Sequence, residues 1–151
     1  MKQINQEQYR TAVVEDIPAL HRIRVAVKEN VLSDPSRITA KDYETFLLLK
    51  GKGWVCETDG IIKGFAIIDV SEKNIWALFV DPLWEGRGIG STLHDMMLDD
   101  YFSKFSDTLW LGTEPGTRAE KFYRRKGWQE AGIHGINEIK FEMGLNNWKS
   151  V

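Results

Sequence analysis

The sequence predicts a mixed α/β domain, in which a largely antiparallel sheet carries helices on its faces. Three observations carry this prediction. Strand-like apolar segments follow one another closely between positions 54 and 81, which favours an antiparallel meander. A strand, a helical segment and a second strand then succeed one another between 75 and 113, the order of a parallel crossover unit. Two more strand-like segments close the chain around a glycine-rich turn.

Length, charge and cysteine content limit the classes of protein to which the chain can belong. A chain of 151 residues fits one domain spanning 1–151, and it can bury a core without metals or disulfides. The formal net charge of -2 excludes a global basic field that would recruit nucleic acid or an anionic membrane, so any anion site must be local. The single cysteine, Cys56, is expected to be buried and favours a reducing, cytoplasmic compartment. Neither a signal peptide nor a membrane-length apolar run is recognisable.

The first fifty residues predict a short extended piece followed by two helices. Asp16 is placed to cap the first helix, and Thr39 with Asp42 predicts a capping box for the second. Gly51 and Gly53 are expected to end that second helix. Residues at helical spacing give the first helix one face: Ile17, Leu20, Ile23, Arg24 and Val27.

The rest of the chain predicts the sheet and two more helices. "WVCET" and "IIKGFAIIDV" flank Asp59-Gly60, a tight hairpin signal, and "NIWALFVD" ends at Pro82. A helix follows the glycine-rich stretch, and "TLWLGT" is the next strand. "PGTRAEKFYRRKG" predicts a helix with Pro115 near its start and Gly127 at its end. "WQEAGIHGINEIKFEMG" predicts the two closing strands.

The stretch "WEGRGIGST" predicts an anion site at the start of a helix. Backbone N–H groups there lack internal partners, and the helix dipole adds about half a positive charge. Glycines let a phosphate approach the backbone, and Arg87, Ser91 and Thr92 add side-chain donors. The spacing excludes a lysine-containing Walker loop and disfavours the dinucleotide fingerprint. A loop that only connects a strand to a helix remains the alternative.

The surrounding sequence resembles the GNAT family, the Gcn5-related N-acetyltransferases. The family's first signature, (Gln/Arg)-x-x-Gly-x-(Gly/Ala) opening a helix, is matched by Glu85–Gly90 except in its first position. The second signature, around an Ala, a Tyr and a Gly-(Phe/Trp) pair, is matched by Gly116–Trp128 except at its Asn. The resemblance implies a sheet of about six to seven strands with a splayed parallel pair, and about four helices.

The resemblance also implies a binding site for acetyl-CoA. The pyrophosphate would lie on the loop of Glu85, Gly86, Arg87, Gly88, Ile89, Gly90 and Ser91. The pantetheine arm would pair with the backbone of Leu78, Phe79 and Val80, on a strand that carries a bulge. A backbone N–H near Phe79 or Val80 would stabilise negative charge on the thioester oxygen. Gly116, Arg118 and Phe122 complete the expected cofactor contacts, and no metal site is expected.

Tyr123 matches the position that protonates the departing thiolate in many family members. The alternative is that Tyr123 only packs with Ala119 and Phe122 on an apolar helix face. Glu85 replaces the usual Gln or Arg, and its carboxylate is expected either in solvent or paired with Arg87.

No residue is assigned as general base, because the family's usual glutamate positions do not carry one here. Glu114, Asp69 and Glu138 are the candidate substitutes, acting through water. The segment with Glu29, Ser33 and Asp34 is expected either to select the acceptor or only to cap helix ends and form turns. The acceptor is expected to be a small-molecule or peptide amine, and relatives suggest a homodimer. A CoA-binding sensor without transfer activity, and transfer of a longer acyl group, stay open.

Overall fold

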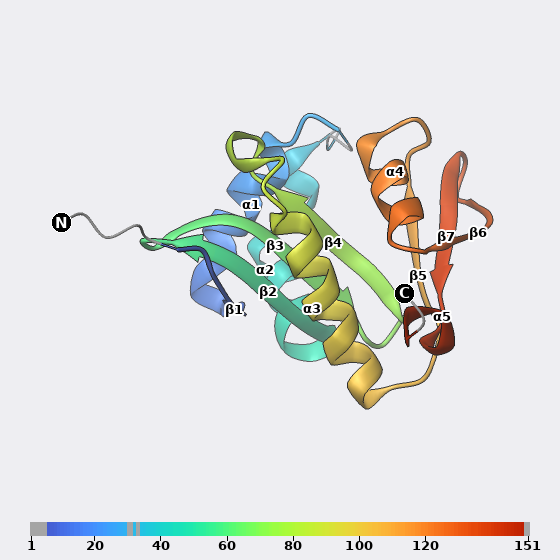
Figure 1. Ribbon diagram of the computed structural model, residues 1–151. Helices are drawn as coiled ribbons and strands as arrows, with labels where there is room; N and C mark the ends of the chain where they lie inside the picture. The colour runs from blue at the N-terminus through green and yellow to red at the C-terminus, as the bar shows by residue number, and fades with distance from the viewer. Residues whose placement is uncertain (1–5, 30–31, 33, 150–151) are drawn as a thin grey trace.

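The computed structural model describes residues 6–29, 32 and 34–149, and its centre is a seven-stranded sheet in the order β1-β2-β3-β4-β5-β7-β6 (Figure 1). The strands are β1 (Gln8–Thr11), β2 (Gly51–Thr58), β3 (Ile61–Asp69), β4 (Asn74–Val80), β5 (Leu109–Thr113), β6 (Gln129–His134) and β7 (Glu138–Met143). β4 and β5 are parallel and every other neighbouring pair is antiparallel. The predicted mixed sheet is therefore confirmed.

Helices cover both faces of this sheet. They are α1 (Ile17–Ala26), α2 (Ala40–Thr45), α3 (Ile89–Lys104), α4 (Arg118–Arg125) and α5 (Leu145–Lys149). α1 and α2 lie together on one face, and α3 crosses the other face in front of β2, β3 and β4 (Figure 1). Across the described part of the chain, no helix is both long and apolar enough to cross a membrane.

Alternation along the strands divides the core into two layers. On β3, Phe65 and Ile67 pack in the layer of α1 and α2, whereas Ala66 and Ile68 pack in the layer of α3 and α4. This is the two-residue period expected of a sheet that is buried on both faces. The layers are hereafter called the α1/α2 face and the α3/α4 face.

β4 and β5 separate soon after they meet. Their only register pair among the described residues is Asn74 with Trp110, at the start of β4. The pairing of β4 with β3 shifts between Ile67 and Ile68, whose partners are Ala77 and Ile75. Trp76 is therefore the extra residue of a β-bulge, which bends β4 away from β5. Beyond the bulge, the edge of β4 that faces β5 has no backbone pairing to that strand.

Two local predictions were wrong and a third was right in part. Gly51 ends the second helical segment as predicted, because it is the C-cap of a π-helical turn, Phe46–Lys50, that continues α2. Gly53 does not end it but lies within β2, where a Cβ would come within 2.5 Å of the Leu47 side chain. α4 begins three residues after Pro115, with the Thr117 hydroxyl accepting a hydrogen bond from the Glu120 N–H. Asp16 precedes α1, but its carboxylate accepts hydrogen bonds from Arg10 and from the Val13 N–H instead of capping that helix.

Candidate functional site

The loop after β4 ends in an open helix terminus. Asp81 follows the last residue of β4, and its carboxylate accepts hydrogen bonds from the Leu83 N–H and from Arg22. Gly86 and Gly88 then adopt φ angles of 77° and 82°, which strongly favour glycine, and Gly88 is the N-cap of α3. A Cβ at either position would meet nothing within 4 Å, so the loop surface is open. The first N–H groups of this 16-residue helix are thus available to an anion.

The other residues in and beside this loop differ in which of their atoms can face a ligand. Ile89 is buried in the core, so only its backbone can face a ligand. A Cβ at Gly90 would stand 3.5 Å from the side chain of Val80, at ordinary van der Waals distance. The guanidinium of Arg87 lies 4.8 Å from the centre of the Trp84 ring. The ammonium of the buried Lys63 lies 3.7 Å from the centre of the same ring.

Glu85 pairs with a residue that the sequence did not suggest as its partner. Its carboxylate accepts a hydrogen bond of 2.7 Å from the guanidinium of Arg118, the first residue of α4. The carboxylate of Glu85 was expected either in solvent or paired with Arg87, and it pairs with Arg118 instead. Both partners are well exposed, so the ion pair contributes little to stability. It does link the glycine loop to α4.

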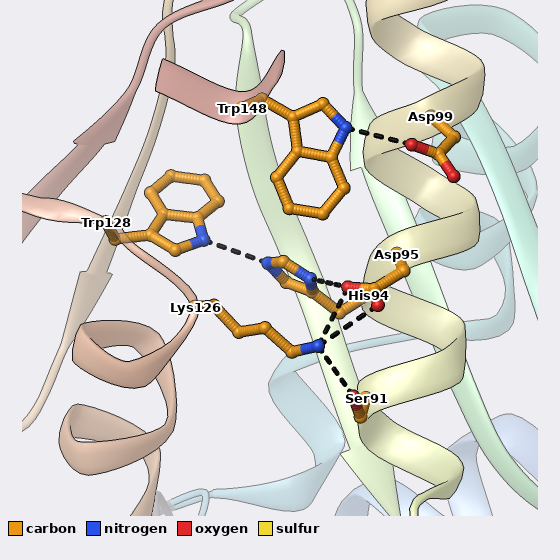
Figure 2. A network of polar contacts seen from close by, with 7 residues as sticks. All are labelled: Ser91, His94, Asp95, Asp99, Lys126, Trp128 and Trp148. Carbon is orange, nitrogen blue, oxygen red and sulfur yellow. Dashed lines mark hydrogen bonds and ion pairs between the residues drawn. The ribbon is translucent and has the colours of Figure 1, made fainter. Parts of the chain in front are cut away.

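A network of polar contacts joins the first turns of α3 to the end of α4 and to α5 (Figure 2). The ammonium of Lys126 donates to the Ser91 hydroxyl at 2.6 Å and to the Asp95 carboxylate at 2.9 Å. The Trp128 indole donates to Nε2 of the fully buried His94, so His94 must carry its proton on Nδ1, which faces Asp95. Burial lowers the pKa of His94 and favours this neutral form.

A pocket opens where β4 and β5 separate. Its lining comes from five elements: Arg24 of α1; Ile75, Trp76, Ala77, Leu78 and Phe79 of β4; Leu111, Gly112 and Thr113 of β5; Ala119 and Tyr123 of α4; and Glu138 of β7. Leu78 and Tyr123 belong to the α3/α4 face, whereas Trp76 and Phe79 belong to the α1/α2 face. The pocket therefore receives side chains from both faces of the sheet. A shallow hollow beside the β2–β3 hairpin, lined by Gln6, Gln8, Glu57, Asp59 and Gly60, lies away from these residues.

Tyr123 is both a core residue and a pocket residue. Its side chain is 8% exposed, and its ring packs against those of Phe122, Trp128 and Phe141. Burial raises the pKa of the phenol, so the hydroxyl is protonated at neutral pH. The two expectations for Tyr123 are thus compatible, because the ring packs in the core while the residue lines the pocket. Phe122 lies beside it, with its ring against the imidazole of His94.

Only one of the three candidate bases lines the pocket. Asp69 is buried in the β3–β4 turn, where its carboxylate accepts from Ser71 and from the Glu72 N–H. Glu114 does not line the pocket; its carbonyl oxygen accepts from the Thr117 hydroxyl. Glu138 lines it, and its carboxylate lies over Gly112, where a Cβ would come within 2.8 Å of it.

Two further expectations concern the loops around α4. The carboxylate of Glu29 accepts from the Arg118 N–H at 3.0 Å, so the segment after α1 contacts the start of α4. Asp34 accepts from the Ser36 N–H in a turn, and Ser33 lies outside the described residues. Gly116 has a φ of 78° and its N–H donates to Glu120, so this N–H is already used within the helix cap.

Sequence reasoning missed two cations at the site. Lys126 follows α4 in the sequence but reaches Ser91 of α3, a contact that no local pattern indicates. Arg24 could have been recognised from the sequence, because it falls on the apolar face of its helix, where a charged side chain is unusual. Cys56 is buried as expected, and burial raises the pKa of its thiol. The described residues contain no group of three or more His, Cys, Asp or Glu side chains suited to a metal.

Comparison with known proteins agrees with this geometry. Residues 50–130 match the model of the acetyltransferase (GNAT) domain. An uncharacterized N-acetyltransferase of Methanocaldococcus jannaschii is 36% identical over an alignment of 89 residues, which covers 51% of this chain and 38% of that protein. The match thus spans well under half of that relative's length.

Solved structures share the fold over nearly the whole chain. The ribosomal-protein-S18-alanine N-acetyltransferase of Escherichia coli superposes with a TM-score of 0.76 and 19% identity, covering 93% of this chain and 94% of that one. The PaiA N-acetyltransferase of Thermoplasma acidophilum, solved in complex with coenzyme A, gives a TM-score of 0.74 and 14% identity, covering 92% and 99%.

Proposed function

Because the chain belongs to the GNAT acetyltransferase domain family, we propose that it is an acetyl-CoA-dependent N-acetyltransferase that acts on a primary amine. One observation carries this proposal. The pocket between β4 and β5 is lined from both faces of the sheet, so two molecules can meet in it from opposite sides. Direct transfer between two bound substrates requires that both be held in contact in the right orientation, which such an arrangement allows.

The residues present fit CoA on the α3/α4 face. The open N-terminus of α3 and the nearby cations Arg87, Lys126 and Arg118 suit a pyrophosphate. The edge of β4 beyond the bulge offers backbone groups to the amides of the pantetheine arm, as an added strand would. Leu78 and Ala119 add apolar surface for the arm's methylene groups. The departures at Glu85 and Gly116 remove side-chain contacts but leave this backbone cradle intact.

Acetyl-CoA supplies an activated acetyl thioester when it is bound. The neutral amine of the acceptor forms the new bond to the acetyl carbon, the carbon–sulfur bond breaks, and one proton passes from nitrogen to sulfur. Tyr123, which burial keeps protonated, provides the proton to sulfur. A backbone N–H of β4 near Phe79 or Val80 stabilises charge on the acetyl oxygen. Glu138, directly or through water, takes the proton from the amine.

Two measurements test the proposal. Calorimetry should give binding of CoA and acetyl-CoA but not of NAD, and release of free CoA should follow addition of a suitable amine from an acceptor panel. NAD binding without CoA binding would exclude the proposal. CoA binding without transfer to any amine would favour the sensor alternative. Faster turnover with longer acyl-CoAs would correct the acyl group.

A further inference from the structure

A cation with one nitrogen that lacks a hydrogen-bond partner among the described residues lines the pocket opposite the expected CoA side. Arg24 extends from α1, and its guanidinium carbon lies 4.3 Å from the centre of the Phe79 ring. Its Nη1 atom is buried and makes no hydrogen bond to any residue that the structure describes. The Tyr43 hydroxyl, on the neighbouring helix, is instead within 3.0 Å of Nδ1 of His21. A buried charged donor without a partner costs free energy, so the fold retains this group at some expense of stability.

Arg24 lies on the face from which an acceptor would enter. Phe79, which it covers, packs in the layer of α1 and α2, whereas Tyr123 packs in the layer of α3 and α4. CoA on the α3/α4 face would leave Arg24 to the second substrate. The guanidinium stays charged at neutral pH even though burial lowers its pKa. Its donors form a fork that matches a carboxylate.

The pocket is lined by a cationic side chain from one element and an anionic side chain from another. Glu138 of β7 lines the same pocket as Arg24 of α1, and no ion pair among the described residues joins the two. Trp76 and Phe79 provide aromatic surface between these elements. A molecule with an amine at one end and an anion at the other would satisfy both charges. A diamine or polyamine would place a second cation near Arg24 and be repelled.

We propose that the acceptor is an amine that also bears a carboxylate, an amino-acid-type molecule, and that Arg24 binds this carboxylate. This inference rests on the proposed N-acetyltransferase function and names the substrate class of the same site. The carboxylate would bind the guanidinium of Arg24 where this residue lines the pocket, and orient the amine toward Glu138 and the thioester. Arg24 is then a specificity-determining residue for the acceptor, with no part in CoA binding.

Matched acceptors test the proposal. The panel pairs free amino acids, including ω-amino acids of increasing length, with the corresponding amides, which keep the amine but lose the negative charge. For the wild type, kcat/KM should be at least about tenfold higher for the carboxylate member of the best pair. Arg24→Gln should remove this preference by lowering kcat/KM for the carboxylate member alone, and Arg24→Lys should restore part of it. Lys28→Gln removes an exposed positive charge just after α1 and should change neither value.

The possible outcomes distinguish a failure of this inference from a failure of the proposed N-acetyltransferase function. Equal rates on carboxylates and amides, or an Arg24→Gln variant that loses both equally with CoA affinity unchanged, would overturn the assignment of Arg24 but leave N-acetylation intact. A wild type that binds no CoA would overturn the proposed function itself. Circular dichroism and CoA calorimetry on each variant establish that the fold and the cofactor site persist. If Arg24→Gln fails to fold, Arg24→Lys alone decides the matter, because a shift in the carboxylate-to-amide ratio must accompany its shorter reach.

Discussion

Tyr123 combines a buried, closely packed ring with a place in the lining of the pocket. Its ring is held by three neighbouring aromatic rings, so removing the hydroxyl alone leaves the packing in place. Burial raises the pKa of the phenol above its ordinary value of 10, so the hydroxyl is protonated throughout the neutral pH range.

Tyr123→Phe should therefore lower kcat by about tenfold or more while CoA affinity stays nearly constant. The loss should be in proton transfer to sulfur, since the variant keeps the ring. Steady-state kinetics with CoA calorimetry measures both quantities. An unchanged kcat would remove Tyr123 from the mechanism and leave it a packing residue.

Glu85 is the exception in the glycine loop, and its contact with Arg118 gives it a testable role. The pair holds a cation that could otherwise turn toward a phosphate. Glu85→Gln should tighten CoA binding, but by less than about tenfold, because exposed ion pairs are weak and backbone N–H groups dominate the site.

The control for Glu85→Gln is Glu130→Gln, which breaks another ion pair of α4, that with Arg124, away from the loop. Calorimetry on both variants should show a change only for Glu85→Gln. A gain of a hundredfold would instead mean that Glu85 is the main determinant of CoA affinity.

The contact between α3 and α4 depends on the protonation state of His94. In the fold, Nε2 accepts a hydrogen bond from Trp128, which a doubly protonated imidazole could not do. The folded-state pKa lies below the ordinary value of 6.5. The stabilisation is thus fully present above pH 6.5 and is lost as the pH falls through the folded-state pKa.

Chemical denaturation at several pH values should accordingly show the free energy of unfolding falling as the pH is lowered from about 7.5 to 5.5. His94→Gln, which cannot titrate, should be less stable at pH 7.5 but show a shallower pH dependence. Equal slopes for the two proteins would contradict the role of His94.

The helices and strands differ in how far the sequence predicted them. The capping box of Thr39 and Asp42 and the hairpin at Asp59-Gly60 were confirmed because each is local chemistry within four residues. α5 was not predicted, because five residues carry too little periodicity. Gly53 was misjudged because a glycine is needed there for close packing against Leu47 and Ile67, which no local pattern indicates.

The candidate site was predicted where it depends on backbone and local spacing, as in the glycine loop. It was not predicted where side chains from distant elements meet. Nothing along the sequence places Arg24 opposite Glu138, since α1 and β7 come together only through the sheet order. The same holds for the contact of Lys126 with Ser91.

Across the whole molecule, the sheet consists of two parts, β1–β4 and β5–β7, that share one register pair in the described residues. A CoA arm lying against β4 would occupy the gap between them. Hydrogen exchange should therefore slow in a peptide covering 76–81 when CoA is added, as well as in the loop 85–91. Protection confined to the loop would mean that only the pyrophosphate is held. A peptide covering the β2–β3 hairpin, 55–63, is the internal control and should not change.

The opening between β4 and β5 also bears on the solubility of the protein. A strand with unpaired N–H and C=O groups is normally a hazard at the border of a sheet, where it can recruit a strand of another chain and begin aggregation. Here the free edge of β4 lies in the interior of the sheet order, with β5 on its open side and α4 beside it. A second polypeptide would have to bring its side chains through this gap, whereas a slender ligand with two amides would not. The fold thus shields this unpaired edge of β4 from the strands of other chains.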